Sequence, residues 1–270
     1  MASPSSPLPE LSPSNARLAA ARRLTRRRGR SDAGRFLAEG AQAVREALAA
    51  GVVVETFATA EAAARHPELT VDASLVGDRD AATLSETSTP QGLVAVCALA
   101  QPSLADVLAA APQLLVALVE PNEPGNLGAV IRTADAAGAD AVIVDGGADP
   151  YGGKAVRASA GSLFHLPVVA SPVADLLTAT AAAGRTSLAT SGHGDVDLFD
   201  LESDGSLQQP TIWLFGSEAH GLPGEVLAAV DRRVRIPIRG RAESLNLAAA
   251  AAVCLYASAR AQSLSTPSGE

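Results

Sequence analysis

From residue 113 onward, uninterrupted apolar runs alternate with stretches of helical periodicity. Such runs are typical of strands buried on both faces, and the alternation predicts a parallel sheet covered by helices. We expect about six strands, at residues 114–120, 141–145, 165–169, 185–191, 211–216 and 233–236. Helices are expected at residues 127–137, 155–160, 173–183, 224–229 and 247–260, and a loop at residues 192–205.

The pattern before residue 100 is shorter and more mixed. It predicts a compact α/β domain of about four strands and three helices, opening with a helix over residues 14–30 that Ser14 caps. The predicted domains are therefore an α/β domain at 14–99, a linker at 100–112 and a parallel-sheet domain at 113–262. A Pro/Ser-rich disordered tail is expected at 1–13 and a free tail at 263–270.

Composition narrows the class of protein. Hydrophobic residues make up 47% of the chain and aromatic residues only 3%, so the core is built mainly from Ala, Val and Leu. No long apolar run lacks a polar break, and the N-terminal stretch has no apolar signal core, so neither a membrane protein nor a secreted one is expected. Cys97 and Cys254 lie far apart in apolar segments, which is typical of reduced thiols in a cytosolic protein.

Charge is distributed unevenly along the chain. The net charge is −8, but residues 1–35 hold eight arginines against Glu10 and Asp32, a balance of +6 that leaves −14 for the remainder. A basic segment on an acidic body indicates a phosphate-bearing partner that meets one face. The arginines expected to contact RNA are Arg22, Arg23, Arg26, Arg27, Arg28 and Arg30.

Three of the expected strands end in loops dense with polar residues. In parallel α/β sheets, ligands bind outside the carboxyl ends of the strands. The first loop leads to Asn126 and, six residues further along its helix, Arg132. The second holds Gly216, which would let a ligand approach the backbone closely, and Glu218 at its mouth.

The third loop, residues 239–246, runs into an almost wholly apolar helix that must be buried. Either Ser244 or Asn246 can cap this helix, because both side chains can accept hydrogen bonds from free amides of the first turn. Polar groups that converge on a buried helix N-terminus favour a site for a polar ligand.

Motifs for other chemistries are absent from the sequence. It has no G-x-G-x-x-G after a strand and no G-x-x-x-x-G-K-[ST], and GSEAHG is not a nucleophile elbow. The four histidines lack metal-ligand spacing, so no metal site is expected. We expect Asp135, Asp140 and Asp145 to be solvated or to cap helices rather than to act in catalysis. His193 and Asp195 are expected in a surface turn.

Taken in chain order, the three loops resemble the signature motifs of the SpoU/TrmH family of RNA ribose 2′-O-methyltransferases, in the SPOUT superfamily. The matching stretches are NLGAVIRTADAAGAD, LFGSEAHGL and IPIRGRAESLNLAAAAAV. NARLAAARRL, GRFLAEGAQAVREAL and TPQGLVAV are similar to the RNA-binding domain of this family. The resemblance extends over residues 14–262 and favours members that act on ribosomal RNA.

The resemblance implies a parallel-sheet catalytic domain with a C-terminal trefoil knot, a rare exception to unknotted chains. It also implies a homodimer with sites at the subunit interface, against which the apolar helix at 247–260 would be partly buried. S-adenosylmethionine would bind among the loops, held largely by backbone groups. The residues that it assigns to this cofactor are Thr190, Ser191, Gly192, Leu214, Phe215, Gly216, Glu218, Ile236, Ile238, Ser244, Leu245 and Asn246.

The resemblance further implies catalytic roles for Asn126, Arg132, Glu218, Ser244 and Asn246. A ribose 2′-hydroxyl is a weak acid, so the site must stabilise the developing alkoxide and align oxygen, methyl and sulfur. Arg132 would supply positive charge; a role as base would need a strongly perturbed guanidinium. Asn126 would orient the ribose or Glu218, Glu218 would fix Arg132 or its neighbours, and Ser244 and Asn246 would line the transfer point.

The sequence thus predicts a cytoplasmic, S-adenosylmethionine-dependent RNA 2′-O-methyltransferase with 23S ribosomal RNA as its substrate. A transfer RNA substrate stays open, as does a non-catalytic RNA-binding or ribosome-assembly protein. The intact polar residues of the three loops argue against the non-catalytic alternative. A small-molecule nucleotide enzyme is disfavoured by the basic segment and by the missing phosphate loops.

Overall fold

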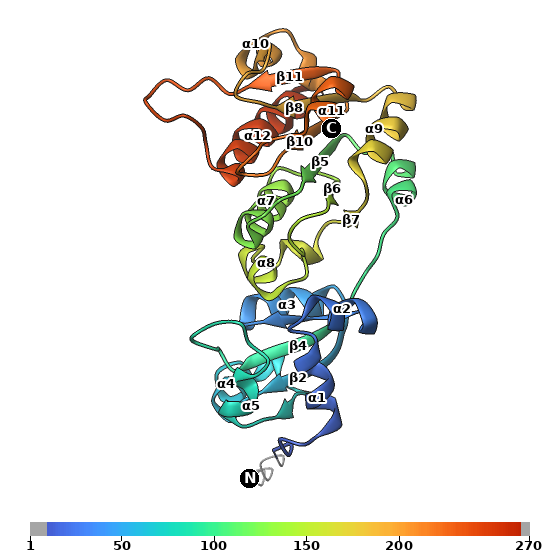
Figure 1. Ribbon diagram of the computed structural model, residues 1–270. Coiled ribbons are helices and arrows are strands. Elements are labelled where there is room, and N and C mark those ends of the chain that lie inside the picture. The colour runs from blue at the N-terminus through green and yellow to red at the C-terminus, as the bar shows by residue number, and fades with distance from the viewer. Residues whose placement is uncertain (1–9, 266–270) are drawn as a thin grey trace. The chain divides into compact units, whose positions relative to one another are not determined.

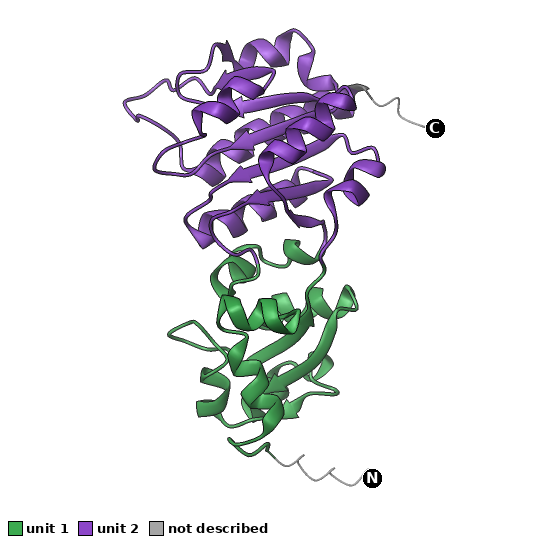
Figure 2. Cartoon of the chain, turned by 45° about the vertical axis from the view of Figure 1, so that its right-hand side comes forward, with its two compact units in different colours: residues 1–100, 151–164 green, residues 101–150, 165–270 purple. Residues whose placement is uncertain are grey.

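The structure is a computed structural model that describes residues 10–265. The chain divides into unit 1, residues 1–100 and 151–164, and unit 2, residues 101–150 and 165–270 (Figures 1 and 2). Residues 1–9 of the predicted disordered tail and 266–270 of the predicted free tail lie outside the described residues. Within the described part of the first tail, the Leu11 amide donates to the Leu75 carbonyl at 2.8 Å, so this segment is held against unit 1.

Unit 1 is built on a four-stranded mixed sheet in the order β1-β4-β2-β3 (Figure 1). β4 runs antiparallel to both β1 and β2, and β3 joins β2 in parallel. The strands are β1 (Arg35–Glu39), β2 (Val53–Ala58), β3 (Ser74–Leu75) and β4 (Leu93–Ala98). The helices are α1 (Ala16–Arg23), α2 (Arg27–Ala33), α3 (Ala41–Ala49), α4 (Ala60–Arg65), α5 (Asp78–Ala82) and α8 (Gly153–Ala158), with 3-10 turns η1 (Pro67–Leu69) and η2 (Ser162–Phe164).

The single helix predicted over residues 14–30 is wrong, because two helices, α1 and α2, occupy this region. The chain is extended at Arg26, and Gly29 packs so closely on the Arg23 carbonyl that a Cβ there would lie 2.0 Å from its oxygen. A straight helix could not make this contact. The cap also differs from the prediction: Asn15, rather than Ser14, accepts from the Arg17 amide at 2.9 Å.

Residues 151–164 belong to unit 1, although the sequence pattern predicts them within the 113–262 domain. The ring of Phe36 on β1 lies 5.0 Å from that of Tyr151 and 5.9 Å from that of Phe164. Arg157 Nη1 donates to Glu39 Oε2 at 3.0 Å, and the Glu39 side chain is only 7% exposed. This segment therefore completes the core of unit 1 from a distant part of the sequence.

Unit 2 contains the predicted parallel sheet, with seven strands rather than six, in the order β7-β6-β5-β10-β8-β11-β9. The strands are β5 (Leu114–Val119), β6 (Ala141–Asp145), β7 (Val168–Ala170), β8 (Thr186–Thr190), β9 (Val196–Asp197), β10 (Thr211–Phe215) and β11 (Arg232–Arg235). The helices are α6 (Leu104–Ala109), α7 (Pro124–Ala136), α9 (Val173–Ala182), α10 (Leu198–Ser203), α11 (Gly224–Ala229) and α12 (Leu247–Ser265), with the 3-10 turn η3 (Ser206–Gln208).

Helices cover both faces of the unit 2 sheet. Val107 of α6, Leu176 of α9 and Val226 of α11 pack into one apolar cluster with the strands. α7 and α12 pack against each other on the opposite side, as Figure 1 shows. The indole Nε1 of Trp213 donates to Ser258 Oγ at 2.8 Å, and both side chains are fully buried, so α12 is fixed to β10.

Only α12, among the described residues, is long and apolar enough to qualify as a membrane span by length and hydropathy. Its contacts with β10, β5 and α7 give it the packing of a core helix, with one face left outward. The helix runs to Ser265, so residues 263–265 are not part of a free tail as predicted.

Two segments of unit 2 hold more structure than the sequence indicated. The linker expected at 100–112 contains α6, which Ser103 and Asp106 cap reciprocally. The loop expected at 192–205 contains β9 and α10. β9 pairs with β11, and ion pairs from Asp195 to Arg233 and from Asp197 to Arg235 support this short ladder.

The Arg157–Glu39 pair yields a stability prediction. In an Arg157→Met variant the nearly buried Glu39 carboxylate loses its charged partner, and we expect unit 1 to lose about 1–3 kcal/mol in free energy of unfolding. Amide hydrogen exchange should accelerate in β1 and β4, while fluorescence of Trp213, the single tryptophan of the chain, reports an unchanged unit 2.

The matched control adds Glu39→Gln to the Arg157→Met variant. It removes the uncompensated charge and should recover part of the lost stability. Unchanged exchange in β1 and β4 of the Arg157→Met variant would contradict the role assigned to this ion pair.

Candidate functional site

The sheet order brings the first two polar loops together. β5 and β10 are neighbouring parallel strands, with Leu118 opposite Phe215. Their carboxyl ends therefore lie at the same edge, at the point where the chain switches from building one side of the sheet to the other. The loop after β5 begins α7 with Pro124 as its first residue, and Asn126 sits in the first turn.

A chain of hydrogen bonds joins all three loops. Asn126 Nδ2 donates to Glu218 Oε1 at 2.8 Å, and Asn246 Nδ2 donates to Asn126 Oδ1 at 3.0 Å. The Asn122 amide donates to the second oxygen of Glu218 at 3.1 Å. The partners lie 92, 120 and 96 residues apart, so the fold alone assembles this cluster.

The third member of this chain also begins the last helix. Asn246 Oδ1 accepts from the Ala248 amide at 2.9 Å, which satisfies a free donor of the first turn of α12. Of the two caps that the sequence left open, Asn246 is the one observed. The geometry therefore fixes both ends of the Asn246 amide, with its oxygen on α12 and its nitrogen on Asn126.

The electrostatics of Glu218 follow from these contacts. Partial burial raises the pKa of its carboxyl, but hydrogen bonds from Asn126 and from the backbone amides of Glu218, Asn122 and Glu123 lower it by more. The net result is a carboxyl pKa below its ordinary value. An ionised carboxylate only accepts hydrogen bonds, so Glu218 sets the direction of the whole chain through Asn126 to Asn246.

Arg132 and Ser244 are not joined to this hydrogen-bonded chain. Arg132 is exposed on α7 and makes no hydrogen bond or ion pair with any residue in the described range 10–265. Ser244 is exposed in the loop before α12. Of the neighbours that Glu218 was expected to fix, the structure thus selects Asn126 rather than Arg132.

A hollow of about 610 Å³ lies beside the third loop. Three residues of the predicted cofactor set, Gly192, Ile236 and Ile238, line it together with Phe199 and Arg235. Drug-sized ligand pockets span roughly 300–1,000 Å³ and combine apolar walls with a few charged groups. Its lining is mostly polar, with an apolar part from Phe199, Ile236, Pro237 and Ile238, and its charged side chains of both signs suit the amino and carboxylate groups of S-adenosylmethionine.

Other residues of the predicted cofactor set lie in β10, at the end of β8 and in the third loop. Leu214 and Phe215 are fully buried in β10. Thr190 Oγ1 donates to the Leu214 carbonyl at 3.1 Å, and the Ser191 amide donates to the Val234 carbonyl at 2.9 Å. Leu245 is 38% exposed in the third loop, beside Ser244 and Asn246.

Gly216 has a structural role that the sequence did not indicate. A Cβ at this position would lie 2.1 Å from the Gly221 backbone carbon and 2.3 Å from the Leu222 amide nitrogen. The absent side chain therefore allows a close turn, in which the Ser217 amide donates to the Gly221 carbonyl and the Gly221 amide donates back. The turn presents Glu218 to the first loop.

The three aspartates predicted to be non-catalytic have structural partners. Asp140 Oδ2 accepts from the Gln113 and Leu114 amides at 2.7 and 2.9 Å, and Asp145 Oδ2 accepts from the Val173 amide at the start of α9 at 2.9 Å. Asp135 lies 2.7 Å from His165 Nδ1. Within the described residues, no group of three or more His, Cys, Asp or Glu side chains could hold a metal ion.

The arginines of the N-terminal segment fall into two classes. Arg30 is 6% exposed and donates to the Leu24 carbonyl at 2.9 Å, which removes it from the surface that RNA could meet. Arg22 is half-buried and donates to Asp80 and Thr83. The predicted RNA-contacting arginines that are exposed are Arg23, Arg26, Arg27 and Arg28.

Sequence reasoning missed two features of the site. Asn122 contributes a main-chain amide, which no side-chain motif can reveal. The Asp197–Arg235 pair, with contacts of 2.8 and 3.1 Å, forms part of the lining of the hollow. The sequence does hold an indication of this pair. The two aspartates at 195 and 197 have the same two-residue spacing as the arginines at 233 and 235, as expected for side chains that pair across neighbouring strands.

Comparison with known proteins places this geometry in a family. Residues 113–256 match the model of the SpoU rRNA Methylase family, and residues 15–95 match the MRM3-like substrate binding domain. The chain belongs to the SpoU rRNA methylase family.

One curated relative matches this SpoU-family chain over most of its length, and another matches about half of it. It is 34% identical, over 87% of its residues and 92% of the relative, to the 23S rRNA (guanosine(2553)-2'-O)-methyltransferase RlmP of Bacillus subtilis. It is 45% identical, over 52% of its residues and 50% of the relative, to the 23S rRNA (uridine(2479)-2'-O)-methyltransferase of Streptomyces viridochromogenes.

Solved structures agree with this assignment. The SpoU methyltransferase AviRb from Streptomyces viridochromogenes, in complex with AdoMet, matches 95% of this chain and 100% of its own, with a TM-score of 0.80 and 35% identity. The expected α/β fold with a parallel sheet, the methyltransferase class and the S-adenosylmethionine cofactor are thereby confirmed for this SpoU methyltransferase.

The hydrogen-bonded chain at the site yields a prediction about catalysis. Asn126→Ala removes the side-chain donor to Glu218 and the acceptor of Asn246. A hydrogen bond to a charged group contributes about 1.5–3 kcal/mol, so we expect the rate of methyl transfer at saturating RNA to fall by about 10- to 100-fold. The measurement is transfer of labelled methyl under single-turnover conditions, and a rate within about twofold of wild type would contradict the role assigned to Asn126.

The same variant has a pH signature. The folded-state pKa of Glu218 is lowered, so its hydrogen bonds stabilise the fold above the carboxyl pKa of the unfolded chain, and this contribution is lost as pH falls through the folded-state pKa. The stability difference between wild type and Asn126→Ala should be present at neutral pH and shrink in acid. Urea unfolding followed by Trp213 fluorescence measures it, with both proteins repeated in a Glu218→Gln background as the pH-independent control.

Proposed function

We propose that this chain transfers the methyl group of S-adenosylmethionine to the 2′-hydroxyl of a ribose in 23S ribosomal RNA. The hydrogen-bonded chain Glu218–Asn126–Asn246 carries the proposal, because it assembles polar residues of all three signature loops at one edge of the sheet. The relatives RlmP and AviRb, whose names specify 23S rRNA or the SpoU class, support the choice of substrate and reaction.

The side chains of this cluster have distinct tasks in the proposed reaction. The bound cofactor supplies a methyl group already activated on a sulfonium. Asn126 and Asn246 each use one amide hydrogen in the observed chain and retain a second for the ribose or its phosphate. Glu218 holds Asn126 in one orientation, which reduces the loss of entropy on aligning the reactants.

Arg132 is proposed to act by its charge. It lies in the same helix as Asn126, is exposed and has no partner within the described residues, so its guanidinium is free to bind the substrate. A positive group near the 2′-oxygen or the adjacent phosphate stabilises the alkoxide that develops during transfer. Ser244, exposed in the third loop, is proposed to contact the same nucleotide.

Unit 1 is proposed to hold the RNA. Most of it matches a substrate binding domain, and exposed arginines gather where α1 meets α2. Guanidinium groups bind phosphate oxygens in a bidentate manner, which suits contact with an RNA backbone. The RNA surface that we propose consists of Arg23, Arg26, Arg27 and Arg28. We place the protein in the cytoplasm, where ribosomal RNA is modified, without a metal or membrane partner.

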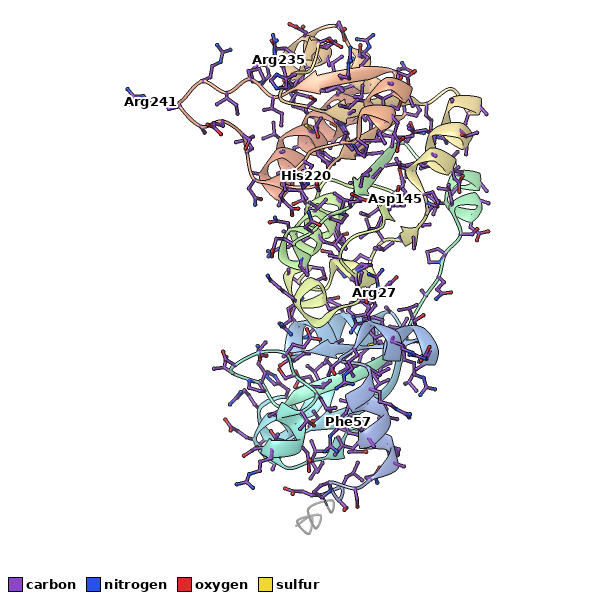
Figure 3. All side chains as sticks on the ribbon, in the orientation of Figure 1. Arg27, Phe57, Asp145, His220, Arg235 and Arg241 are labelled. Carbon is purple, nitrogen blue, oxygen red and sulfur yellow. The ribbon has the colours of Figure 1, made fainter. Side chains whose placement is uncertain are left out.

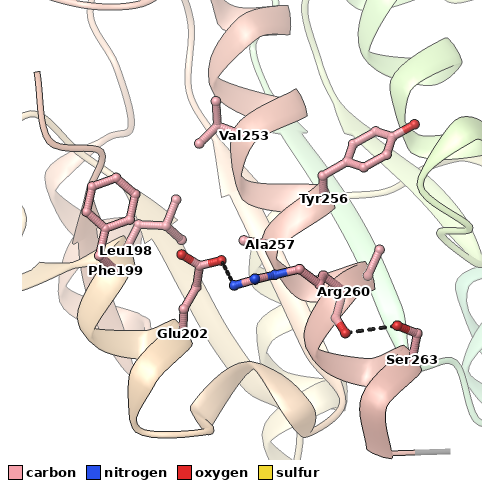
Figure 4. Close-up of a pocket in the computed structure, with 9 residues that line it drawn as sticks. Leu198, Phe199, Glu202, Val253, Tyr256, Ala257, Arg260 and Ser263 are labelled. Carbon is pink, nitrogen blue, oxygen red and sulfur yellow. Dashed lines mark hydrogen bonds and ion pairs between the residues drawn. The ribbon is translucent and has the colours of Figure 1, made fainter.

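The proposed enzyme is a homodimer. Phe199, Val253 and Tyr256 are 47%, 39% and 53% exposed, and they line a hollow of about 600 Å³ between α10 and α12 (Figure 4). An apolar face of this kind on a soluble domain marks an interaction surface. We also propose that the chain after β11 forms the trefoil knot of the family, since α12 returns to pack on β10 and β5.

The test of the proposed function is a methyl-transfer assay. Purified protein is incubated with tritiated S-adenosylmethionine and undermodified 23S rRNA, and labelled positions are mapped by primer extension that stops at 2′-O-methyl groups. We expect one labelled nucleotide, and at least about 100-fold less label with Arg132→Ala, because charge stabilisation of this kind contributes about 3 kcal/mol.

Label on transfer RNA in place of ribosomal RNA would replace the substrate but keep the reaction. Cofactor binding without label on either RNA would overturn the proposed reaction. Absence of both cofactor binding and label would favour the non-catalytic RNA-binding alternative.

The dimer proposal has its own test. Tyr256→Glu places a charge on the apolar face, and we expect the sedimentation coefficient to change from that of a dimer to that of a monomer, with loss of methyl transfer. Leu48→Glu, at a similarly exposed leucine in unit 1, is the matched control and should leave the dimer intact. A wild-type protein that sediments as a monomer would contradict the proposal.

A further inference from the structure

Two arginines of the third loop lack the partners that other arginines of unit 2 possess. Five of the eight arginines in unit 2 are held by contacts within the described residues. Arg232, Arg233, Arg235 and Arg260 form ion pairs with aspartates or a glutamate, and Arg185 donates to the Pro112 carbonyl. The three without such a contact are Arg132, Arg239 and Arg241.

The loop that carries Arg239 and Arg241 projects from the body of unit 2. Residues 238–246 are all exposed, and Figure 3 shows Arg241 at the far end of the loop, turned away from the sheet. No residue from 238 to 245 makes a hydrogen bond or ion pair with the described part of the chain. Free guanidinium groups at the end of an exposed loop are available to an external ligand.

Both ends of this loop are anchored at functional positions. At its start, Ile236 and Ile238 line the hollow assigned to the cofactor. At its end, Asn246 bonds to Asn126 and caps α12. A ligand bound at the tip of the loop is therefore only a few residues along the chain from the residues proposed to contact the reacting ribose. Ser244, for example, lies three residues after Arg241.

Arg239 and Arg241 lie in an acidic part of the chain, so they are not simply two of many solvated arginines on a basic domain. Residues 36–270 carry a net −14, and in this acidic context the paired arginines of unit 2 are neutralised by their neighbours. Like the proposed catalytic Arg132, Arg239 and Arg241 make no hydrogen bond or ion pair within the described residues, and Arg239 interacts with Asp197 only at longer range. A polyanion is the ligand class that fits two free guanidinium groups separated by one glycine, because each can take a phosphate in bidentate fashion.

We propose that Arg239 and Arg241 bind the phosphodiester backbone of the RNA beside the target nucleotide, as a second RNA contact apart from unit 1. This inference rests on the proposed function and deepens it by assigning substrate contacts within the catalytic unit. Phosphate binding at the tip would draw the loop onto the RNA and bring Ser244 and Asn246 to the ribose.

The test compares RNA binding and methyl transfer of wild type and the Arg239→Ala/Arg241→Ala variant. Each lost phosphate contact lowers the slope of log binding constant against log salt by about 0.7 on single-stranded RNA, so we expect a reduction of about 1.4. We also expect KM for RNA to rise by about tenfold or more at moderate salt, a typical loss for two phosphate contacts. The rate at saturating RNA should fall as well, because the loop that carries Ser244 and Asn246 is no longer drawn onto the RNA. The single variant Arg241→Ala, which leaves Arg239 in the lining of the hollow, should keep the cofactor Kd of wild type.

Two further variants sharpen the result. Arg239→Lys/Arg241→Lys retains the charge and should keep the salt slope of wild type. Arg232→Ala removes an arginine paired with Asp204 in the same unit, and it should leave slope and KM unchanged.

An unchanged salt slope in the double alanine variant would overturn the inference. A weaker cofactor Kd with an unchanged slope would also overturn it, by assigning the arginines to the cofactor. The salt dependence of RNA binding is measured without catalysis. A wild-type protein that binds RNA but transfers no methyl group would therefore contradict the proposed function and leave this inference standing.

Discussion

The site depends on one hydrogen bond between Glu218 and Asn126. The two residues follow neighbouring strands of a parallel sheet, and their contact holds the first two loops at one edge. An ionised carboxylate cannot donate, so it orients the Asn126 amide, which in turn orients Asn246 and the start of α12. Without the Glu218 carboxylate as acceptor, the side-chain amides of Asn126 and Asn246 could rotate by half a turn. Their donors and acceptors would then no longer be fixed in one orientation.

Helix α12, which Asn246 caps, links the candidate site to the core of unit 2. Trp213 and Ser258 fix it to the sheet through a fully buried hydrogen bond. Its opposite face leaves Val253 and Tyr256 exposed. The same helix thus begins beside the cluster of Glu218, Asn126 and Asn246 and carries an exposed apolar surface, so the proposed subunit contact and the candidate site would share one support.

The parallel sheet was predictable because strands buried on both faces read as uninterrupted apolar runs. The candidate site was predictable as far as it consists of polar side chains at strand ends, such as Asn126 and Glu218. β9 was not predictable in this way, since a two-residue strand depends on aspartate–arginine pairs 38 residues apart. The break between α1 and α2 likewise depends on a close contact of Gly29 with the Arg23 carbonyl, which no local pattern reveals.

The path of the chain through residues 151–164 has a consequence for dissecting the protein. The chain passes between the units after residues 100, 150 and 164, so no single cut separates them. A fragment that began at residue 101 would still carry Ala155, Val156 and Leu163, which are buried in unit 1. Such a fragment would expose an apolar surface that invites aggregation. Any attempt to attach unit 2 to another domain must therefore replace the 151–164 segment as well.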